Sequence, residues 1–249
     1  MIGYERKKMI IEILGQSDVA FIADLAAAAG VSESTARRDV EKLVKDGQVV
    51  ALRGGAVRLN ERLTELPSAV KELINKEAKT AIAAVAAQYV SDGDTIYVDA
   101  GTTPLQVVPL LRDMKVQIVT SNTHLLALVP DPKWQVIVLA GEYLAGTGSV
   151  VGSLTEDLLR GMFFDISFIG VSGISTKAGI TTFDVREAMK KKIIIANSTR
   201  SYVLADSAKF GRSSSYKVTD LKDAFIITDQ YNEILGSAAE HRIAKPEET

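Results

Sequence analysis

Hydrophobic residues recur at helical spacing near the start of the chain. Ile10, Ile13 and Leu14 follow an i, i+3, i+4 pattern, which places all three on one face of a helix. The stretch 22–29 repeats this pattern, and Gly30 follows it directly, at the position where glycine commonly ends a helix. The pattern therefore predicts two short helices in succession, the second of which ends at Gly30.

A third helix is predicted immediately after this glycine. Ser32 has a side-chain oxygen of the kind that caps helix N-termini, and Gly47 marks the end of the helical pattern. One face is apolar and is expected to be buried; it consists of Ala36, Val40, Leu43 and Val44. The opposite face is polar and consists of Ser34, Arg38, Glu41 and Lys45, with Arg37 on its flank.

A glycine-rich turn follows the third helix. Residues 48–52 and 56–59 are strand-like and flank Arg53-Gly54-Gly55, which predicts a two-stranded wing. Helix, turn, helix and wing in this order are typical of a module whose second paired helix enters the DNA major groove. Arginines on a helix face are often merely solvated, but here they follow a serine cap and precede a wing. The expected DNA-binding residues are Ser32, Ser34, Thr35, Arg37, Arg38, Arg53, Gly54 and Gly55.

The rest of the chain alternates β-branched runs with helical runs. The predicted strands are 95–98, 115–120, 135–139, 165–169, 202–204 and 224–227. This alternation is typical of an α/β domain with a mostly parallel sheet. A polar stretch that contains Pro67 lies between the two regions. We therefore predict a winged helix-turn-helix domain (1–60), a linker (61–76) and an α/β domain (77–249).

Small and hydrogen-bonding residues follow several of the predicted strands. The strand at 95–98 leads to Asp99 and a Gly101-Thr102-Thr103 turn, and then to Pro104, a residue favoured in the first turn of a helix. Free amides at such a helix start bind anions such as phosphate, although Thr102 is equally explained as a plain helix cap. Similar groups occur at 120–122, 140–142, 170–173 and 205–210. Open parallel sheets bind ligands at the carboxyl ends of their strands, so these residues predict a ligand site there.

Composition restricts the chemistry of both regions. The chain has no cysteine and two histidines, which excludes disulfides, thiolate nucleophiles and cysteine-based metal sites. The net charge is −2, so DNA binding has to depend on where the basic residues are placed rather than on bulk charge. No apolar run reaches the roughly 18 residues of a membrane span, and no targeting segment is visible. We therefore expect a cytoplasmic protein without membrane association, cofactor or bound metal.

The motifs of both regions resemble those of DeoR-family transcriptional regulators. In the first region they are the run 31–40, which contains Thr-Ala-Arg-Arg-Asp, then Gly47, and then Gly54-Gly55-Ala56. In the second region they are the strand ends at 99–103, 120–122, 168–173, 179–182 and 204–210, which are similar to the effector domain of that family. This effector domain is similar to ribose-phosphate isomerases and CoA transferases. The resemblance covers residues 3–230.

The resemblance implies an effector site for a phosphorylated sugar or polyol. The Gly101-Thr102-Thr103 turn would hold the phosphate, and Lys209 would supply a positive charge nearby. Hydroxyl groups would be bound by Asp99, Asn122 and Asp184. The full expected set is Asp99, Gly101, Thr102, Thr103, Asn122, Gly141, Ser172, Gly173, Asp184, Asp206 and Lys209. Glu187 and Lys191 are less specific, because their i, i+4 spacing is equally explained by a surface ion pair.

The expected function is a ligand-controlled transcription factor. The resemblance implies a repressor of a carbohydrate-utilisation operon that binds double-stranded operator DNA as a homodimer or homotetramer and is released by its effector. A transcriptional activator and a sugar-phosphate isomerase with an appended DNA-binding module are the alternatives. The acid–base groups for such an enzyme would be Asp99, Asp184, Glu187, Asp206 and Lys209. No separate nucleophile or metal constellation accompanies them, so we expect a regulator and not an enzyme.

Overall fold

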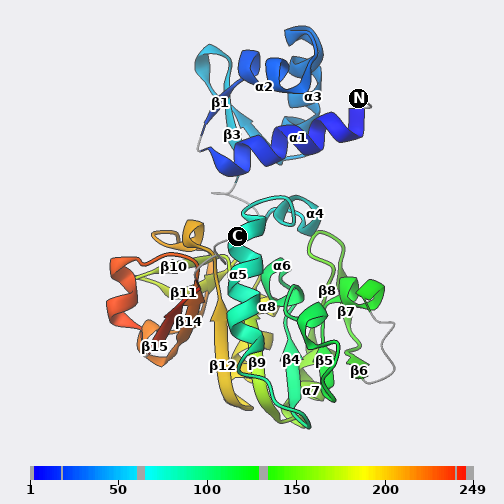
Figure 1. Ribbon diagram of the computed structural model, residues 1–249, viewed down its shortest axis with the longest axis vertical. Helices are drawn as coiled ribbons and strands as arrows, with labels where there is room; N and C mark the ends of the chain where they lie inside the picture. The colour runs from blue at the N-terminus through cyan, green and yellow to red at the C-terminus, as the bar shows by residue number, and fades with distance from the viewer. Residues whose placement is uncertain (1–2, 18, 61–64, 129–133, 239, 245–249) are drawn as a thin grey trace. The chain divides into compact units, whose positions relative to one another are not determined.

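The computed structural model describes residues 3–17, 19–60, 65–128, 134–238 and 240–244. The chain divides into two units, Met1–Lys76 and Glu77–Thr249 (Figure 1). The first unit joins α-helices to a small antiparallel sheet, and the second is built on a parallel sheet. The predicted fold class, a winged helix-turn-helix followed by an α/β domain, is confirmed.

The first unit contains the predicted helices and wing. Its helices are α1 (Gly3–Gln16), α2 (Ile22–Ala29) and α3 (Glu33–Lys45). Its strands are β1 (Ala20–Phe21), β2 (Val49–Ala51) and β3 (Ala56–Leu59), with η1 (Arg53–Gly55) between β2 and β3. The strands are antiparallel in the order β1-β3-β2. Gly30 ends α2 in the left-handed conformation with φ 63°, and Ser32 caps α3, both as predicted.

The core of the first unit follows the predicted helix faces with one clear difference. In α1 two of the three predicted core positions are buried, and Ile13 packs against the same core while half-buried. In α3 the prediction for Val44 is wrong, because this side chain is exposed and Asp39 is buried instead. The buried stripe of α3 turns toward Asp39 because Arg6 of α1 forms an ion pair with its carboxylate.

The segment expected to be a linker packs into the first unit wherever it is described. Residues 61–64 lie outside the described part of the chain. Beyond them, the short helix α4 (Ser68–Lys71) forms, and Leu66, Val70 and Ile74 are buried in the same core as the three helices. Only Val70 of these three lies in α4, while Leu66 precedes the helix and Ile74 follows it. The boundary between the two units therefore falls after α4 and not before it.

The second unit is built on a seven-stranded sheet in which neighbouring strands are parallel. The order across the sheet is β15-β14-β12-β9-β4-β5-β6. The strands are β4 (Thr95–Val98), β5 (Gln117–Thr120), β6 (Gln135–Val138), β9 (Phe164–Gly170), β12 (Ser198–Leu204), β14 (Phe225–Thr228) and β15 (Glu240–Ile243). The pattern predicted all of these except β15. This edge strand reads Glu-His-Arg-Ile and is mostly polar and exposed, so it lacks a hydrophobic signal.

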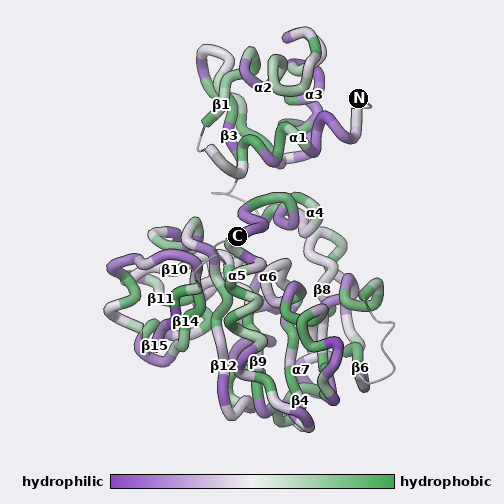
Figure 2. Tube along the Cα trace, viewed as in Figure 1, coloured by the Kyte–Doolittle hydropathy of each residue, from purple (hydrophilic) through white to green (hydrophobic). Residues whose placement is uncertain are grey.

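Helices cover both faces of this sheet. One face packs against α5 (Lys76–Ala87), η2 (Val108–Leu111) and η3 (Thr123–Leu128), and α5 lies on the near side in Figure 1. The other face packs against α7 (Ser153–Arg160) and α8 (Val185–Ala196). Successive side chains of β4 point to opposite faces of the sheet. Ile96 and Val98 pack in the core under α5, and Tyr97 packs in the core under α7 and α8. Figure 2 shows the resulting hydrophobic stretches, in green, along the central strands.

Smaller elements complete the second unit. One hairpin consists of β7 (Glu142–Leu144) and β8 (Ser149–Val151). An antiparallel sheet consists of β10 (Gly173–Ser175), β11 (Gly179–Thr182) and β13 (Tyr216–Thr219). The short helices are α6 (Thr102–Leu105), η4 (Ser207–Lys209), η5 (Leu221–Asp223) and η6 (Glu233–Ser237). Over the described residues, no helix is both long enough and apolar enough to cross a membrane.

The strand order of the main sheet reverses between β4 and β9. The chain runs from β4 outward through β5 and β6, and then returns so that β9 pairs with the other side of β4. From there β12, β14 and β15 extend in the opposite direction. At such a reversal the connections diverge, and open α/β sheets bind their ligands there, beyond the carboxyl ends of the strands. Asp99, which follows β4, and Gly170, which ends β9, lie at this point.

Candidate functional site

The N-terminal half of α3 presents exposed polar side chains. The backbone N–H of Thr35 donates to Ser32 Oγ at 3.3 Å, and this oxygen also lies 2.9 Å from the hydroxyl oxygens of Ser34 and Thr35. The Ser32 oxygen is thus engaged in capping the helix. Ser34, Arg37 and Arg38 are exposed. They lie at the end of the helix that a helix-turn-helix module directs at base edges.

A buried ion pair holds α3 against α1. Arg6 Nε donates to Asp39 Oδ2 at 2.7 Å, and the side chain of Asp39 is almost fully buried. Asp39 follows Arg38 directly, so its attachment to α1 fixes the rotation of α3 and the direction of the exposed arginines. Sequence reasoning gave Asp39 no role, because its partner lies 33 residues away. The signal available in the sequence was that Asp39, a carboxylate, lies next to the apolar face of the predicted third helix.

The tip of the wing contains two glycines in the left-handed conformation. Gly54 has φ 77° and Gly55 has φ 78°, and a Cβ atom added to either would meet no atom within 4 Å. Glycine is therefore required here by backbone conformation and not by space. Arg53 precedes them and is exposed. The wing thus carries a guanidinium group at its tip.

Asp99 joins three elements at the strand reversal of the second unit. Its carboxylate is fully buried, and Oδ2 accepts a hydrogen bond from the backbone N–H of Gly170 at 3.0 Å. The same oxygen forms an ion pair with the ammonium group of Lys191 in α8. The other oxygen, Oδ1, has no hydrogen-bond partner among the described residues, and Lys190 Nζ lies 3.9 Å from it. A buried carboxylate oxygen without a donor is costly, so this atom can accept a hydrogen bond from a ligand.

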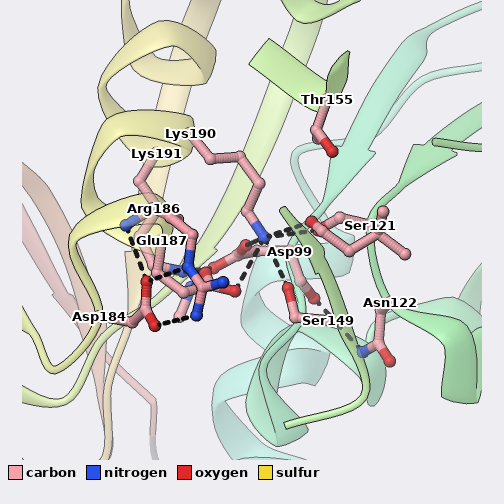
Figure 3. A network of polar contacts seen from close by, with 12 residues as sticks. Asp99, Ser121, Asn122, Ser149, Thr155, Asp184, Arg186, Glu187, Lys190 and Lys191 are labelled. Carbon is pink, nitrogen blue, oxygen red and sulfur yellow. Dashed lines mark hydrogen bonds and ion pairs between the residues drawn. The ribbon is translucent and has the colours of Figure 1, made fainter. Parts of the chain in front are cut away.

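Asp99 belongs to a buried network of four charged side chains (Figure 3). Lys190 and Lys191 are consecutive in α8, and both pair with Glu187 of the same helix. Their ammonium nitrogens lie 3.0 and 3.1 Å from its two carboxylate oxygens. The interpretation of Glu187 and Lys191 as a surface ion pair is therefore wrong. Two cations and two anions balance, which is the arrangement that a protein interior tolerates.

The pKa values in this network reflect burial and the opposing charges. Burial raises the pKa of the Glu187 carboxyl, but the ammonium groups of Lys190 and Lys191 outweigh it and hold the pKa well below its ordinary value. Burial lowers the pKa of the Lys191 ammonium, but the carboxylates of Asp99 and Glu187 outweigh it and keep the pKa above its ordinary value. Both groups are therefore charged at neutral pH.

Sequence reasoning missed Lys190 and the hydroxyl groups around it. Lys190 Nζ donates to Ser121 Oγ at 2.8 Å and to Ser149 Oγ at 2.7 Å, as Figure 3 shows. Ser121 Oγ in turn lies 2.8 Å from the hydroxyl oxygen of Tyr97. The lysine thus ties α8 to the end of β5 and to β8. The signal in the sequence was the Glu-x-x-Lys-Lys run, in which both lysines lie about one helical turn from the glutamate.

The Gly101-Thr102-Thr103 turn follows Asp99, but the helix that begins there is short. Because α6 spans only four residues, its dipole adds little, and an anion here would depend on the turn amides and hydroxyls. Thr103 is buried and Thr102 is half-buried. A Cβ atom on Gly101 would lie 2.9 Å from Pro104 Cδ and 3.3 Å from Gly170 Cα. Glycine thus allows the turn to approach the end of β9 closely.

Asn122 lies beside Asp99 on the neighbouring strand end. Its Nδ2 donates to the Asp99 carbonyl oxygen at 3.5 Å, and its Oδ1 accepts the backbone N–H of His124 at 3.0 Å. Asn122 is almost fully buried. The structure therefore brings these two predicted effector residues together at the strand reversal.

Three further predicted residues have structural roles in the described contacts. A Cβ atom on Gly141 would lie 2.1 Å from Thr155 Oγ1, and one on Gly173 would lie 2.7 Å from the Arg212 carbonyl oxygen. Close packing by itself requires glycine at both positions. Ser172 is half-buried between β9 and β10, where its backbone N–H joins the small antiparallel sheet.

Asp184 caps α8 and forms an ion pair beside it. Its Oδ1 accepts the backbone N–H of Arg186 at 2.8 Å, and its Oδ2 lies 2.8 Å from the guanidinium group of the same residue. The side-chain hydrogen bond from Arg186 lowers the pKa of Asp184. Arg186 also pairs with Glu142 of β7 at 2.9 Å. Asp184 therefore lies on the helix that carries the buried network (Figure 3).

Asp206 and Lys209 lie one strand further along the same edge. β12 pairs with β9 so that Leu204 lies opposite Gly170, and Asp206 follows shortly after. Asp206 is buried and accepts the backbone N–H of Ala208 at 3.2 Å at the start of η4. Lys209 is half-buried, and no carboxylate in the described part of the chain pairs with its ammonium group.

Both units match known protein-family models. A DeoR-like helix-turn-helix domain matches residues 6–62, and the DeoR C terminal sensor domain matches residues 74–230. The chain belongs to the DeoR family. This member of the DeoR family is a DNA-binding transcriptional regulator with a C-terminal sensor domain, as the sequence motifs predicted.

Curated relatives of this DeoR-family regulator match along most of their length. The uncharacterized HTH-type transcriptional regulator FruR of Bacillus subtilis (strain 168) is 35% identical over 94% of each chain. The glycerol-3-phosphate regulon repressor of Escherichia coli (strain K12) is 30% identical over 84% of each chain. The putative aga operon transcriptional repressor of Escherichia coli O157:H7 is 29% identical, over 91% of this chain and 86% of the relative. These relatives are regulators.

Solved structures of two other protein classes resemble this DeoR-family chain distantly. A D-ribose-5-phosphate isomerase in complex with phospho-erythronic acid aligns with a TM-score of 0.40 and 15% identity, over 54% of each chain. The translation initiation factor eIF-2B of Pyrococcus horikoshii OT3 aligns with a TM-score of 0.43 and 17% identity, over 83% of this chain and 72% of that chain. Neither activity is carried over to this protein.

Proposed function

We propose that this protein represses a carbohydrate-utilisation operon and releases its operator when a phosphorylated sugar or polyol binds the second unit. Two relatives have names of this kind, the glycerol-3-phosphate regulon repressor and the putative aga operon repressor. Glycerol 3-phosphate is itself a phosphorylated polyol. The name of the first relative therefore supports this class of effector.

The first unit would bind the operator through α3 and the wing. Ser34, Arg37 and Arg38 are exposed on α3, and Arg53 is exposed at the wing. Hydroxyl and guanidinium groups donate to phosphate oxygens and to guanine acceptors in the major groove. One such module covers little DNA. Specific affinity therefore needs at least two copies, which read half-sites about one helical turn or a multiple apart.

The observation that carries the effector proposal is that Oδ1 of Asp99 accepts no hydrogen bond from the described residues. It is buried at the strand reversal, and Lys190 Nζ, which lies 3.9 Å from it, is too far away to donate a hydrogen bond. A hydroxyl group of the effector would supply the missing hydrogen bond, and Asn122 lies beside it to bind a second hydroxyl. The phosphate would be held by the Gly101-Thr102-Thr103 turn, with Lys209 as the cation.

The charged groups of this site favour binding over turnover. An isomerase needs a carboxylate that is free to take a proton from carbon. Both oxygens of Glu187 are instead paired with lysines, and its pKa is held low, so it is a weak base. Glu187 is therefore unsuited to be that base, and together with the regulators among the relatives this supports our proposal that the site recognises its effector without converting it.

Gel-shift titration with the full chain tests this function. The probe is the DNA upstream of the protein's own operon, challenged with glycerol 3-phosphate and with aldose and ketose phosphates, each matched by its unphosphorylated form. We expect a sequence-specific complex that at least one phosphorylated compound releases and that its unphosphorylated form leaves intact. Absence of a specific complex would overturn the proposal, as would turnover of a sugar phosphate that is lost in Asp206→Asn.

Two variants of the full chain separate the two activities. Arg38→Ala removes an exposed guanidinium group, and we expect it to weaken operator binding by about 1–3 kcal/mol while effector binding stays unchanged. Thr102→Val combined with Thr103→Val removes two hydroxyls, and we expect it to weaken effector release while operator binding stays unchanged. Gel shift and calorimetry measure the two affinities. If each variant changed both affinities equally, the assignment of the residues would be wrong.

A further inference from the structure

Lys190 is a fully buried lysine to which the proposed function gives no role. Its ammonium group donates to Ser121 Oγ at 2.8 Å, to Ser149 Oγ at 2.7 Å and to Glu187 Oε1 at 3.0 Å (Figure 3). An ammonium group has three N–H donors. These three oxygens therefore engage all of them, and the Val150 carbonyl oxygen, at 3.4 Å, is a weaker neighbour.

This arrangement leaves a charged neighbour of the lysine without a hydrogen bond. Asp99 Oδ1 is buried, accepts no hydrogen bond from the described residues and lies 3.9 Å from Lys190 Nζ. A hydrogen bond between two charged groups is stronger than one to a neutral hydroxyl, and its N···O distance is about 2.7–2.9 Å. A shift of the ammonium group by about 1 Å would therefore form the stronger bond. Two of the three contacts that oppose this shift are neutral serine hydroxyls.

The two hydroxyls are not required to attach the β7–β8 hairpin to the end of β5. The backbone makes that connection, because the N–H of Val150 donates to the Ser121 carbonyl oxygen at 2.8 Å. The N–H of Thr123 likewise donates to the Gly148 carbonyl oxygen at 2.9 Å. The positions of both serines are thus fixed without their side chains, and the hydroxyls have a separate effect, which is to hold the lysine.

We propose that Ser121 and Ser149 are positioning residues for effector recognition, because they hold Lys190 away from Asp99 and leave Oδ1 open to a hydroxyl group of the ligand. This inference rests on the proposed function, in which the same oxygen binds the effector. Without one of the serines, the released N–H of the lysine would turn to Asp99 Oδ1. The hydroxyl of the ligand would then compete with an internal donor for its acceptor.

Crystal structures of the full-length wild type and of Ser149→Ala, both without ligand, test the first step. The substitution removes one acceptor of Lys190 and keeps the backbone contacts of the hairpin. We expect Lys190 Nζ to lie within about 3.2 Å of Asp99 Oδ1 in the variant and beyond hydrogen-bond distance in the wild type. A lysine that keeps its place, or that turns to the Val150 carbonyl oxygen instead, would overturn the proposal.

Calorimetry with the same proteins tests the second step. The probes are glycerol 3-phosphate, glucose 6-phosphate and fructose 6-phosphate, each compared with inorganic phosphate, which lacks the polyol. We expect Ser149→Ala to weaken binding of the preferred polyol phosphate about tenfold, roughly the effect of one hydrogen bond to a charged group, and to leave inorganic phosphate unchanged. Ser167→Ala is the matched control, since this fully buried hydroxyl lies 2.8 Å from Ser201 Oγ and contacts no lysine.

A rescue experiment separates positioning from a merely structural role of Ser149. Adding Lys190→Met to Ser149→Ala removes the competing donor, so we expect the double variant to regain its preference for the polyol phosphate over inorganic phosphate. Local damage would instead leave that preference as low as in the single variant, which would contradict the proposal. Ser149→Thr keeps the hydroxyl oxygen and is expected to retain the preference, which provides a second rescue if the double variant does not fold.

Failure of this inference is distinguishable from failure of the proposed function. A wild type that binds none of the polyol phosphates better than inorganic phosphate would contradict the proposed role of Asp99, and the serine proposal with it. A wild type with a clear preference that Ser149→Ala retains would overturn the role of the serines alone. The crystal structures need no ligand, so they test the position of Lys190 in either case.

Discussion

At the scale of single residues, the buried charges of the second unit stabilise one another across large distances in sequence. Asp99 and Lys191 are 92 residues apart and form a fully buried ion pair. Removing one member of such a pair leaves an uncompensated charge in the interior, whereas removing both leaves none. The pair therefore differs from the exposed ion pairs of the molecule, which contribute about 0–1 kcal/mol each.

Lys191→Met is expected to destabilise the second unit by about 3–5 kcal/mol, because it leaves the buried carboxylates of Asp99 and Glu187 with the single ammonium group of Lys190. Asp99→Asn combined with Lys191→Met is expected to recover part of this loss. The stability of both variants is measured by urea unfolding, followed by the fluorescence of Trp134. Trp134 is the only tryptophan in the sequence, and its Nε1 donates a hydrogen bond to the Leu111 carbonyl oxygen inside the second unit. Lys192→Met, at an exposed position, is the control, and an equal effect from both lysines would contradict the prediction.

Acid is expected to destabilise the second unit through Glu187. Its pKa in the folded chain lies below the ordinary 4.5, so the unfolded chain binds a proton more readily. The stabilisation from this carboxylate is therefore complete above pH 4.5 and is lost as the pH falls toward the lower pKa of the folded chain. Urea unfolding of the wild type from pH 7 to 3 is expected to show this loss, with a flatter profile in Glu187→Gln. Parallel profiles would exclude Glu187 as the cause.

At the scale of elements, local signals predicted helix ends and strands, and long-range contacts accounted for the differences. Gly30 and Ser32 mark the boundary of α2 and α3 because turn and cap geometry depend on neighbouring residues. Asp39 is buried and Val44 is exposed, the reverse of the prediction. The reason is that Asp39 pairs with Arg6, and this pairing depends on the packing of α1 on α3. The segment 61–76 was interpreted as a linker because it is polar and contains Pro67, and the burial of Leu66, Val70 and Ile74 depends on contacts with distant helices.

Gly141, in the connection between β6 and β7, allows this connection to pack closely against Thr155 of α7. Gly141→Ala is expected to destabilise the second unit by about 1–3 kcal/mol, because its Cβ atom would lie 2.1 Å from Thr155 Oγ1. Gly146→Ala is the matched control, since a Cβ atom there would meet nothing within 4 Å. Thermal unfolding measures both variants. Equal melting temperatures would show that the β7–β8 hairpin tolerates the added methyl group.

At the scale of the whole molecule, the charge balance assigns DNA binding to a few placed residues. The chain is net −2, so we expect its affinity for DNA to depend on local cations, and the proposed function includes Arg53 at the wing tip among them. Arg53→Gln is expected to weaken operator binding and to reduce the slope of log affinity against log salt by about 1 per subunit. Gel shift at several salt concentrations measures this. Arg112→Gln, an exposed arginine of the second unit, is the control and is expected to leave the slope unchanged.

The sequence predicted those parts of the candidate effector site that follow directly from the order of strands and helices. Residues after parallel strands meet at one edge, so Asp99 and Asn122 could be placed together from the alternation of strands and helices. The partners of Lys190 could not be placed, because whether a lysine is buried depends on which elements pack over it. Gly141 and Gly173 were predicted to be effector residues from the sequence motifs. In the structure, close packing by itself explains why glycine occupies both positions.

Residues 190–192 are three lysines in a row, of which two are buried and the third is exposed. An acylating reagent applied to the native protein will therefore modify Lys192 and reach its two neighbours only in molecules that have opened. All three amines fall within one short stretch of chain. The acylation pattern of that single peptide, read by mass spectrometry, will report the folded fraction of the sensor directly in a crude extract.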